Sequence, residues 1–435
     1  MKSFYKPSEY NIVCKAKGQA VVANTFSCSV SELTEQELGF LNGCYKESDA
    51  KVNLSDLANA GLMVPCSMEN EKDLLYKGIE LSKTDRTHAT ITVLTTLDCN
   101  FACPYCFQKR NSAVMGENTQ KLVIEHINSV VSQLEPTLES DGTKAPPELG
   151  LCFTGGEPLL VLSAIRRIVQ EVSAECKARC VTLNTTMITN GYLLSQKVAN
   201  VLKELSPKWV VQITLDGPKE IHDTRRALRT GGGTYDRIVD NIKQLDHSVF
   251  TVKLRINVDK TNRHSAKEVY DWACGLENVY PGVALVTAEE TQSEQTKSTC
   301  FSRLDEQFIY EEMNREGIVD SSLDELLQRG TICTAQHQLS CCIDPNGYLY
   351  KCFDKCGQLK LAYKKLGDSS FSNPEAESAF LNRNAVGEEE CSECKLLPQC
   401  LGGCSLMWIE RKKHSCVTAK YLIENALSAL CDPVS

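Results

Sequence analysis

The chain has 435 residues, of which 42% are apolar and 24% are charged, a composition that is ordinary for a folded protein and excludes a disordered chain. Asp and Glu outnumber Lys and Arg by 56 to 47, and the resulting net charge of −9 argues against a nucleic-acid partner held by bulk charge. Residues 1–10 lack the apolar segment of a signal peptide, and no run of about 18 apolar residues occurs. We therefore expect a cytoplasmic protein with no membrane partner.

Cysteine is the outlying residue type, with 23 copies. An odd number cannot be fully paired in disulfides, and a reducing cytosol offers little use for disulfides. Many cysteines in such a protein indicate metal binding or catalysis.

Residues 1–87 are predicted to form a small separate unit that ends in a linker. Two short strand-like runs flank Gly18, which is a hairpin signal, and Thr34 and Glu37 have the spacing of a capping box at a helix start. A second short helix and a closing strand follow. This order predicts a winged-helix-like module, with a plain N-terminal extension of the main domain as the alternative. The runs are residues 10–16, 20–25, 54–60 and 62–64.

Residues 88–310 alternate between strand-like runs and amphipathic helical patterns. Such alternation indicates βα units and a parallel sheet, whose ligand site lies at the carboxyl ends of the strands. We therefore expect an α/β fold. The strand-like runs are residues 90–95, 149–154, 181–189, 209–215, 251–258 and 283–286.

Cys99, Cys103 and Cys106 follow the first strand with the spacing C-x3-C-x2-C. Three thiolates on one loop can hold three irons of a 4Fe–4S cluster and leave the fourth iron open for a ligand. A zinc site would normally need a fourth protein ligand from the loop or its neighbours.

This motif, with Tyr105 before its last cysteine, resembles the radical S-adenosylmethionine (SAM) superfamily, and further motifs at successive strand ends support the resemblance. The resemblance implies a partial (β/α)6 TIM barrel and a SAM site. Asp216 and Arg255 have a structural ion pair or a strand-end cap as their alternative. The residues that the resemblance assigns to SAM are Tyr105, Phe107, Gly155, Gly156, Glu157, Pro158, Thr189, Asn190, Asp216 and Arg255.

The resemblance also implies a reaction. SAM binds the open iron of a reduced cluster and is cleaved to a 5′-deoxyadenosyl radical, which abstracts hydrogen from a substrate. The cofactor carries this chemistry, while the protein orients it and excludes water. An electron donor such as flavodoxin or ferredoxin is then an expected partner.

Residues 311–435 contain a second cysteine pattern, which resembles the SPASM auxiliary-cluster domain. On spacing alone, a zinc ribbon is the rival interpretation. The resemblance implies two auxiliary 4Fe–4S clusters, and so three clusters in all. Auxiliary cluster II would be held by Cys391, Cys394, Cys400 and Cys416, and auxiliary cluster I by Cys333, Cys352 and Cys404.

The fourth ligand of auxiliary cluster I is left open among Cys341, Cys342 and Cys356. Strand alternation would let one of the two adjacent cysteines face the cluster. A three-cysteine cluster with an open iron is the alternative.

Residues 212–236 resemble the branch that modifies ribosomally made precursor peptides, such as the ranthipeptide, darobactin-type and cyclophane-forming maturases. The resemblance implies a thioether, ether or carbon–carbon crosslink between side chains. The N-terminal module would bind the leader of the precursor peptide by strand addition.

Two alternatives remain. A sulfatase-maturating enzyme has an Asp directly after the cysteine equivalent to Cys352, but here Phe353 takes that place and Asp354, a weak candidate general base, follows. A non-enzymatic binding module held by zinc or a cluster is the other, and it would have no need for a nucleoside-sized site at the strand ends.

Overall fold

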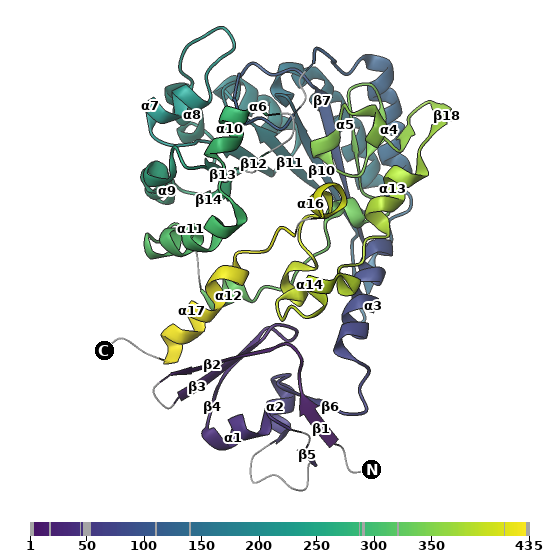
Figure 1. Ribbon diagram of the computed structural model, residues 1–435. Helices are drawn as coiled ribbons and strands as arrows, with labels where there is room; N and C mark the ends of the chain where they lie inside the picture. The colour runs from purple at the N-terminus through teal and green to yellow at the C-terminus, as the bar shows by residue number, and fades with distance from the viewer. Residues whose placement is uncertain are drawn as a thin grey trace. The chain divides into compact units, whose positions relative to one another are not determined.

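The computed structural model describes residues 4–16, 19–43, 45–46, 54–108, 111–138, 141–286, 288, 292–319, 322–412 and 414–431. The chain divides into two compact units (Figure 1), which are described separately. The sheet unit comprises Thr84–Asp305 and Thr334–Leu381, and the terminal unit comprises Met1–Lys83, Glu306–Cys333 and Asn382–Ser435. The domain boundaries given above remain predictions.

The sheet unit is built on one large mixed sheet, in which the described strands follow the order β14-β13-β12-β11-β10-β7-β15-β16-β17-β18. From β7 to β14 each strand pairs in parallel with its neighbour. The expected α/β class with a parallel core is therefore confirmed. The parallel strands are β7 (His88–Thr96), β10 (Glu148–Gly155), β11 (Thr182–Thr189), β12 (Trp209–Thr214), β13 (Phe250–Val258) and β14 (Val279–Leu285).

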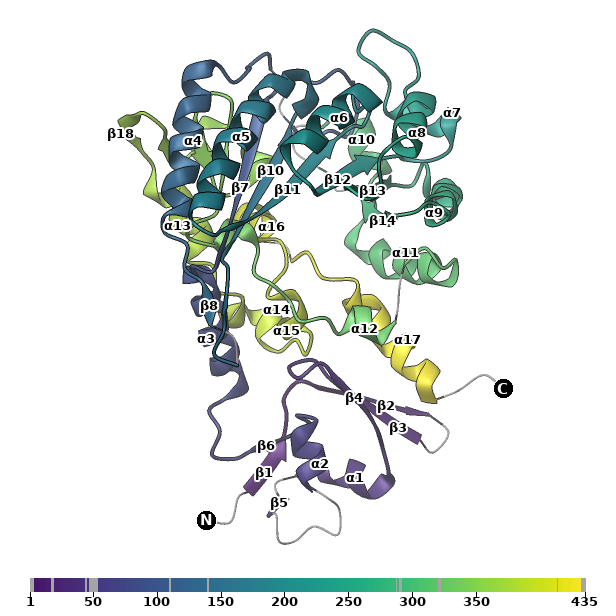
Figure 2. The same ribbon diagram turned by 180° about the vertical axis from the view of Figure 1, so that it is seen from behind.

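Amphipathic helices connect these strands, and Figure 2 shows α4, α5 and α6 along one face of the sheet. In α5 the buried residues Ile165, Ile168, Val169 and Val172 recur at helical spacing, so one stripe of the helix is buried. The helices of this unit are α4 (Glu117–Val131), α5 (Leu162–Ala178), α6 (Gln196–Leu205), α7 (Lys219–Arg225), α8 (Tyr235–Lys243), α9 (Ala266–Cys274), α10 (Glu294–Thr299) and α13 (Pro374–Leu381).

Five of the predicted strands are confirmed to within two residues, but the prediction for the sixth is wrong at its start. It was expected at residues 283–286, whereas β14 begins at Val279 and includes Pro281 and Gly282. These two residues read as a turn in the sequence. A proline is tolerated here because β14 is the edge strand of the sheet, so its missing N–H breaks no ladder.

The chain returns to the same sheet after the parallel core. β15 pairs in parallel with β7, and β16, β17 and β18 continue outward as antiparallel neighbours. This extension brings Cys341 and Cys342 beside the strand that precedes the first cysteine loop. The added strands are β15 (Cys341–Ile343), β16 (Tyr348–Tyr350), β17 (Lys364–Lys365) and β18 (Asp368–Ser372), and a two-stranded ribbon of β8 (Thr137–Leu138) and β9 (Lys144–Ala145) stands apart.

The terminal unit contains two small antiparallel sheets, of order β2-β3-β4 and β5-β1-β6. The central strand β3 is buried on both faces, with Val21 packed toward α17 and Val22 toward α2. The predicted capping box of Thr34 and Glu37 is confirmed at the start of α1, whereas Gly18 lies outside the described residues. The elements are β1 (Phe4–Pro7), β2 (Asn11–Ala16), β3 (Gln19–Asn24), β4 (Ser29–Leu33), α1 (Glu35–Phe40), β5 (Tyr45–Lys46), α2 (Leu54–Asn59), β6 (Met63–Pro65) and α3 (Glu71–Thr84).

The C-terminal cysteine segment shares a core with this N-terminal module. Tyr10 and Leu75 are buried in one apolar cluster with Cys391 and Leu397. The ammonium group of Lys395 also donates to the carbonyl oxygen of Asn11 at 2.6 Å. The helices of this segment and its approach are α11 (Arg303–Arg315), α12 (Leu323–Leu326), α14 (Glu389–Ser392), α15 (Leu397–Cys400), α16 (Ser405–Arg411) and α17 (Ala419–Cys431).

Among the described residues, no helix is long and apolar enough to cross a membrane.

Candidate active site

A cavity of about 580 Å³ opens at the carboxyl ends of the parallel strands, where the topology predicts a ligand site. Its wall takes Thr154 from β10, Thr189 from β11, Thr214 from β12, Asn257 from β13 and Leu285 from β14. Because consecutive parallel strands end at the same edge, residues far apart in the sequence meet around this one space. All lining residues belong to the sheet unit.

The first cysteine loop lies in this wall, with Cys99, Cys103 and Cys106 all lining the cavity and all partly exposed. Burial, and then the charges of Glu157, Cys103 and Cys106, raise the pKa of the Cys99 thiol to about 12. The three sulfurs are thus near enough to oppose one another's ionisation. A positively charged iron cluster would remove that penalty, because metal ligation needs thiolates.

Two glycines hold the loop against the end of β10. Gly155 has a φ of +137°, and a Cβ on Gly156 would stand 1.9 Å from the carbonyl oxygen of Asp98. The Gly156 amide donates to the Thr96 carbonyl at 3.0 Å, and the Glu157 amide donates to the Asp98 carbonyl at 2.9 Å. These contacts place β10 directly against the residue that precedes Cys99. The glycines therefore keep the backbone close to both the loop and the cavity.

Glu157 and Pro158 lie behind the wall rather than in it. The Glu157 side chain is fully buried and accepts hydrogen bonds from the Leu159 amide at 3.0 Å, the Thr189 hydroxyl at 2.7 Å and the Asn190 amide at 2.8 Å. Its carboxylate therefore ties β10 to the end of β11. The contact with SAM that the resemblance assigns to Glu157 and Pro158 stays a prediction.

Tyr105 fixes the position of the first cysteine loop through its hydroxyl group and its ring. Its hydroxyl donates to Asp216 and accepts from the Arg226 guanidinium at 2.6 Å, and Arg225 lies 5.1 Å from the centre of its ring. Arg225 also pairs with Asp216 at 3.4 Å and with Asp259 at 2.8 Å. Asp216 is fully buried and does not line the cavity, and its ion pair with Arg225 is the structural role that the sequence left as an alternative. The contact with SAM that the resemblance assigns to Asp216 stays a prediction.

The remaining residues assigned to SAM all line the cavity: Tyr105, Phe107, Gly155, Gly156, Thr189, Asn190 and Arg255. Arg255 projects from β13 and donates to the side-chain oxygen of Asn257 at 2.7 Å. The cavity also contains Phe353 and Asp354, and Phe353 packs edge-on against Phe107 with ring centres 6.1 Å apart. The candidate base Asp354 therefore lies in the same cavity as the cysteine loop.

Sequence reasoning missed several polar residues of the wall, among them Arg226 and Gln108. Both side chains are more than nine-tenths buried, and within the described part of the chain Arg226 Nε and Gln108 Nε2 have no hydrogen-bond partner. Buried donors without partners indicate a polar ligand. The only signal in the sequence was the Arg225–Arg226 pair, and nothing there says which arginine faces the cavity.

The second cysteine group lies in the terminal unit. Burial, and then the charges of Glu388, Cys400 and Cys394, raise the pKa of Cys391 to about 12, and Cys416 contributes in the same sense at Cys400. Cys391, Cys394, Cys400 and Cys416 therefore lie near one another. Gly403 permits this arrangement, because its φ is +67° and a Cβ there would meet the Ser415 carbonyl at 2.0 Å.

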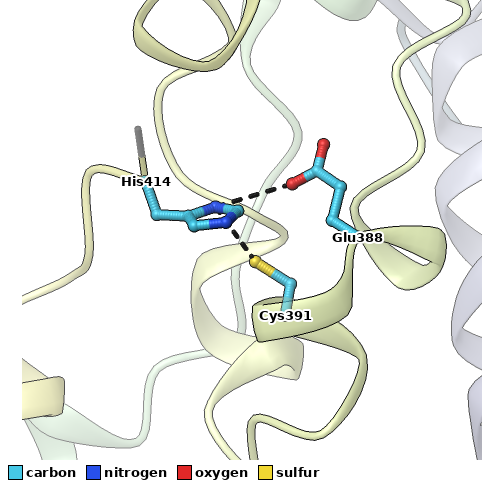
Figure 3. Close-up of side chains that lie close together, drawn as sticks. All are labelled: Glu388, Cys391 and His414. Carbon is cyan, nitrogen blue, oxygen red and sulfur yellow. Dashed lines mark hydrogen bonds and ion pairs between the residues drawn. The ribbon is translucent and has the colours of Figure 1, made fainter. Parts of the chain in front are cut away.

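One set of three metal-ligating side chains lies within 4.8 Å in the described part of the chain, and Figure 3 shows it: Glu388, Cys391 and His414. The imidazole Nδ1 lies 3.3 Å from Cys391 Sγ and 3.5 Å from the Glu388 carboxylate. The sequence analysis did not single out Glu388 or His414.

The cysteines predicted for auxiliary cluster I belong to different units, since Cys352 is in the sheet unit and Cys333 and Cys404 are in the terminal unit. Their shared cluster stays a prediction. Cys341 faces away from Cys342, as strand alternation requires, and lies 3.5 Å from His126 Nε2. Cys342 hydrogen-bonds with Cys356, and the charge of Cys352 is one of the causes that raise the pKa of Cys356.

Residues 93–273 match the radical SAM superfamily. The chain therefore contains a radical SAM domain. The match spans the cysteine loop and most of the cavity wall, so the resemblance drawn from the motifs is confirmed.

The matched relatives include enzymes whose names state a reaction. The chain is 23% identical over 334 residues to a cysteine-type anaerobic sulfatase-maturating enzyme of Clostridium novyi, covering 71% of this chain and 85% of that protein. It is 20% identical over 388 residues to the radical SAM cyclopropyl synthase TigE of Paramaledivibacter caminithermalis, covering 83% and 78%.

Solved structures share the fold. Native anSMEcpe with bound AdoMet and Kp18Cys peptide superposes with a TM-score of 0.58 at 17% identity, covering 79% of this chain and all of that one. The Streptococcus suis SuiB structure gives 0.50 at 14% identity, covering 93% and 97%. The large mixed sheet is thus the radical SAM α/β fold.

Proposed function

We propose that this enzyme abstracts hydrogen from a ribosomally made precursor peptide and installs an intramolecular side-chain crosslink. The observation that carries the proposal is the cavity, which brings three loop thiols, unpartnered buried donors and the Asp354 carboxylate into one space. The sulfatase-maturating activity named for one relative and the peptide bound in one similar structure support a peptide substrate.

Different residues of the chain have different proposed roles at this site. Cys99, Cys103 and Cys106 would hold the cluster, and the backbone at Gly155 and Gly156 lets SAM approach it closely. Arg255 faces the cavity with a charge that suits the methionine carboxylate. When bound, these cofactors supply the hydrogen-atom abstraction, and the auxiliary clusters supply an acceptor for the remaining electron.

Asp354 is the proposed general base. A crosslink removes two hydrogens from the peptide, one as a hydrogen atom and the other as a proton with an electron. A carboxylate oxygen of Asp354 would take that proton, since this residue lines the cavity near the charge of Arg255. The turn Phe353–Lys355 presents it, so the one-residue shift from the sulfatase-maturating pattern still leaves an acid in the cavity.

We assign iron rather than zinc to the C-terminal cysteines. The support is the SPASM-like spacing of these cysteines in a chain that also carries the radical SAM cysteine loop. Either Cys342 or Cys356 would supply the fourth ligand of auxiliary cluster I.

The N-terminal module is the proposed leader-binding element, and we place the leader on β4. In the described residues β4 pairs with β3 on one side and with no strand on the other. An extended peptide could therefore add to that edge as a further antiparallel strand. Residues Val30 and Glu32 alternate outward along this strand.

One specific observation favours a second candidate, the oxidation of a protein cysteine or serine to formylglycine. Sulfatase-maturating enzymes are among the relatives, and Asp354 occupies the cavity. The two reactions leave different products. A crosslink removes two hydrogens and leaves a cyclic peptide, whereas formylglycine formation from cysteine removes sulfur and leaves an aldehyde.

The test is anaerobic incubation of the reconstituted enzyme with SAM, a reductant and short peptides encoded beside its gene, followed by tandem mass spectrometry. The proposal predicts 5′-deoxyadenosine and a peptide that lacks two hydrogens and fragments as a ring. The Asp354→Asn variant should still release 5′-deoxyadenosine but form at least tenfold less crosslinked product. An aldehyde-bearing product would overturn the proposal in favour of the second candidate.

A further inference from the structure

His414 is a buried imidazole fixed from several directions. Its side chain is 7% exposed, and its ring stacks on the Trp408 indole with centres 4.6 Å apart and planes 22° from parallel. Nδ1 points at Cys391 Sγ, 3.3 Å away, while Nε2 lies 3.7 Å from the exposed carboxylate of Glu390. The ring therefore presents one nitrogen to a predicted cluster ligand and the other to the carboxylate of Glu390.

Glu388 is not free to act as a metal ligand beside this ring. Arg383 binds both of its carboxylate oxygens, with Nε at 3.1 Å and Nη2 at 3.2 Å. The same guanidinium donates to the carbonyls of Gly402 at 2.5 Å and Gly403 at 3.1 Å. The carboxylate charge is thus compensated and its position is locked. A single metal ion held by Glu388, Cys391 and His414 would have to compete with a buried arginine.

The hydrogen-bond roles between His414 and Cys391 follow from the ligand chemistry. A cysteine that binds iron does so as a thiolate, which accepts hydrogen bonds and donates none. Nδ1 must then carry the hydrogen and donate it to Cys391 Sγ. The Glu388 oxygen, at 3.5 Å from Nδ1, is the more distant acceptor.

We infer that His414 is a positioning residue that donates to Cys391 and raises the reduction potential of auxiliary cluster II. The inference rests on the proposed function, because it needs that cluster to be present. Hydrogen bonds to the ligating sulfurs stabilise the reduced, more negative state of an iron–sulfur cluster. Trp408 and Glu388 hold the ring in place, and Arg383 holds Glu388.

The test is a redox titration followed by electron paramagnetic resonance on the full chain, in which Cys99, Cys103 and Cys106 are replaced by Ala so that only auxiliary signals remain. His414→Phe keeps the stacking on Trp408 and removes the donor, whereas His414→Gln keeps an N–H group. Glu390→Gln is the matched control, since Glu390 adjoins the other ring nitrogen and its side chain is 65% exposed.

In His414→Phe the ratio of reduced to oxidised cluster at a fixed potential should fall about tenfold, which is 59 mV for one electron. His414→Gln should recover most of that change, and the control should match the parent. An unmoved midpoint in His414→Phe, with iron and sulfide intact, overturns the inference. Loss of about four irons in that variant also overturns it, because His414 would then be a ligand or a scaffold residue. A parent protein with no auxiliary signal refutes the proposed function instead.

Discussion

The Gly156→Ala substitution tests how the end of β10 supports the cysteine loop. The added Cβ would stand 1.9 Å from the carbonyl oxygen of Asp98 and 3.0 Å from the amide nitrogen of Cys99. These neighbours are backbone atoms, so no side chain can move aside. Real Cβ atoms keep at least 3.0 Å from such an oxygen, so the two segments must part by about 1 Å.

The cost can be worked from the contacts that this separation breaks. Two backbone hydrogen bonds join the segments, at 3.0 and 2.9 Å, and each contributes about 0.5–1.5 kcal/mol. Overpacking adds about 1–3 kcal/mol. We expect about 3 kcal/mol of this cost to appear as a loss of SAM-binding free energy, because the displaced atoms form the cavity wall. That loss weakens SAM binding about 100-fold.

The assay is equilibrium binding of SAM to the reconstituted protein, with iron content measured on the same sample. Gly282→Ala is the matched control, since Gly282 lies in the same sheet and a Cβ there meets nothing within 4 Å. The control should bind as the parent does. SAM binding by Gly156→Ala within threefold of the parent would refute the reasoning that this close approach shapes the site.

Two further predictions concern the sheet unit. Burial, and then the charges of Arg226 and Arg225, lower the pKa of His222 from 6.5 to about 3, so the folded state excludes a proton that the unfolded state accepts below pH 6.5. The free energy of unfolding should therefore fall by about 2 kcal/mol as the pH is lowered from 6.5 to 5. The His222→Gln variant should lack this loss when thermal unfolding is measured across the same pH range. Equal pH dependence in the variant and the parent would contradict the prediction. Separately, Cys341→Ser should keep the parent's iron content while Cys342→Ser/Cys356→Ser loses about four irons. A double variant with full iron would instead indicate a three-cysteine auxiliary cluster.

The motifs at the strand ends could be predicted from the sequence, and so could their convergence at the carboxyl-terminal edge of the sheet. Cys99, Gly156 and Asn190 each follow a strand whose neighbours were recognisable, and parallel topology brings such ends to one edge. The capping box at Thr34 was equally local. Local patterns sufficed in these cases because the determining contacts lie within a few residues or follow from strand order.

Contacts between distant segments could not be predicted in the same way. The pairing of β15 with β7 joins Cys342 to Thr92, and the bond from Lys395 to Asn11 ties the C-terminal cysteine segment to the N-terminal module. Neither has a local signal in the sequence. The choice between Cys341 and Cys342 likewise needed the strand's orientation. The strand at Pro281 was missed because an edge position, which makes proline acceptable, depends on the whole sheet.

The shared core of Tyr10, Leu75 and Cys391 has a practical consequence for testing leader binding. Deleting the N-terminal module would expose the apolar surface beneath the cysteine segment. Single substitutions at the β4 edge are therefore the better probe of peptide binding.

The measurement that tests the central claim most directly is the iron and acid-labile sulfide content per chain after anaerobic reconstitution. Three 4Fe–4S clusters predict about 12 of each. About four of each, with zinc present, would contradict the proposed auxiliary clusters and leave a radical SAM enzyme with a zinc-held C-terminal segment. A protein that binds no iron would contradict the account as a whole.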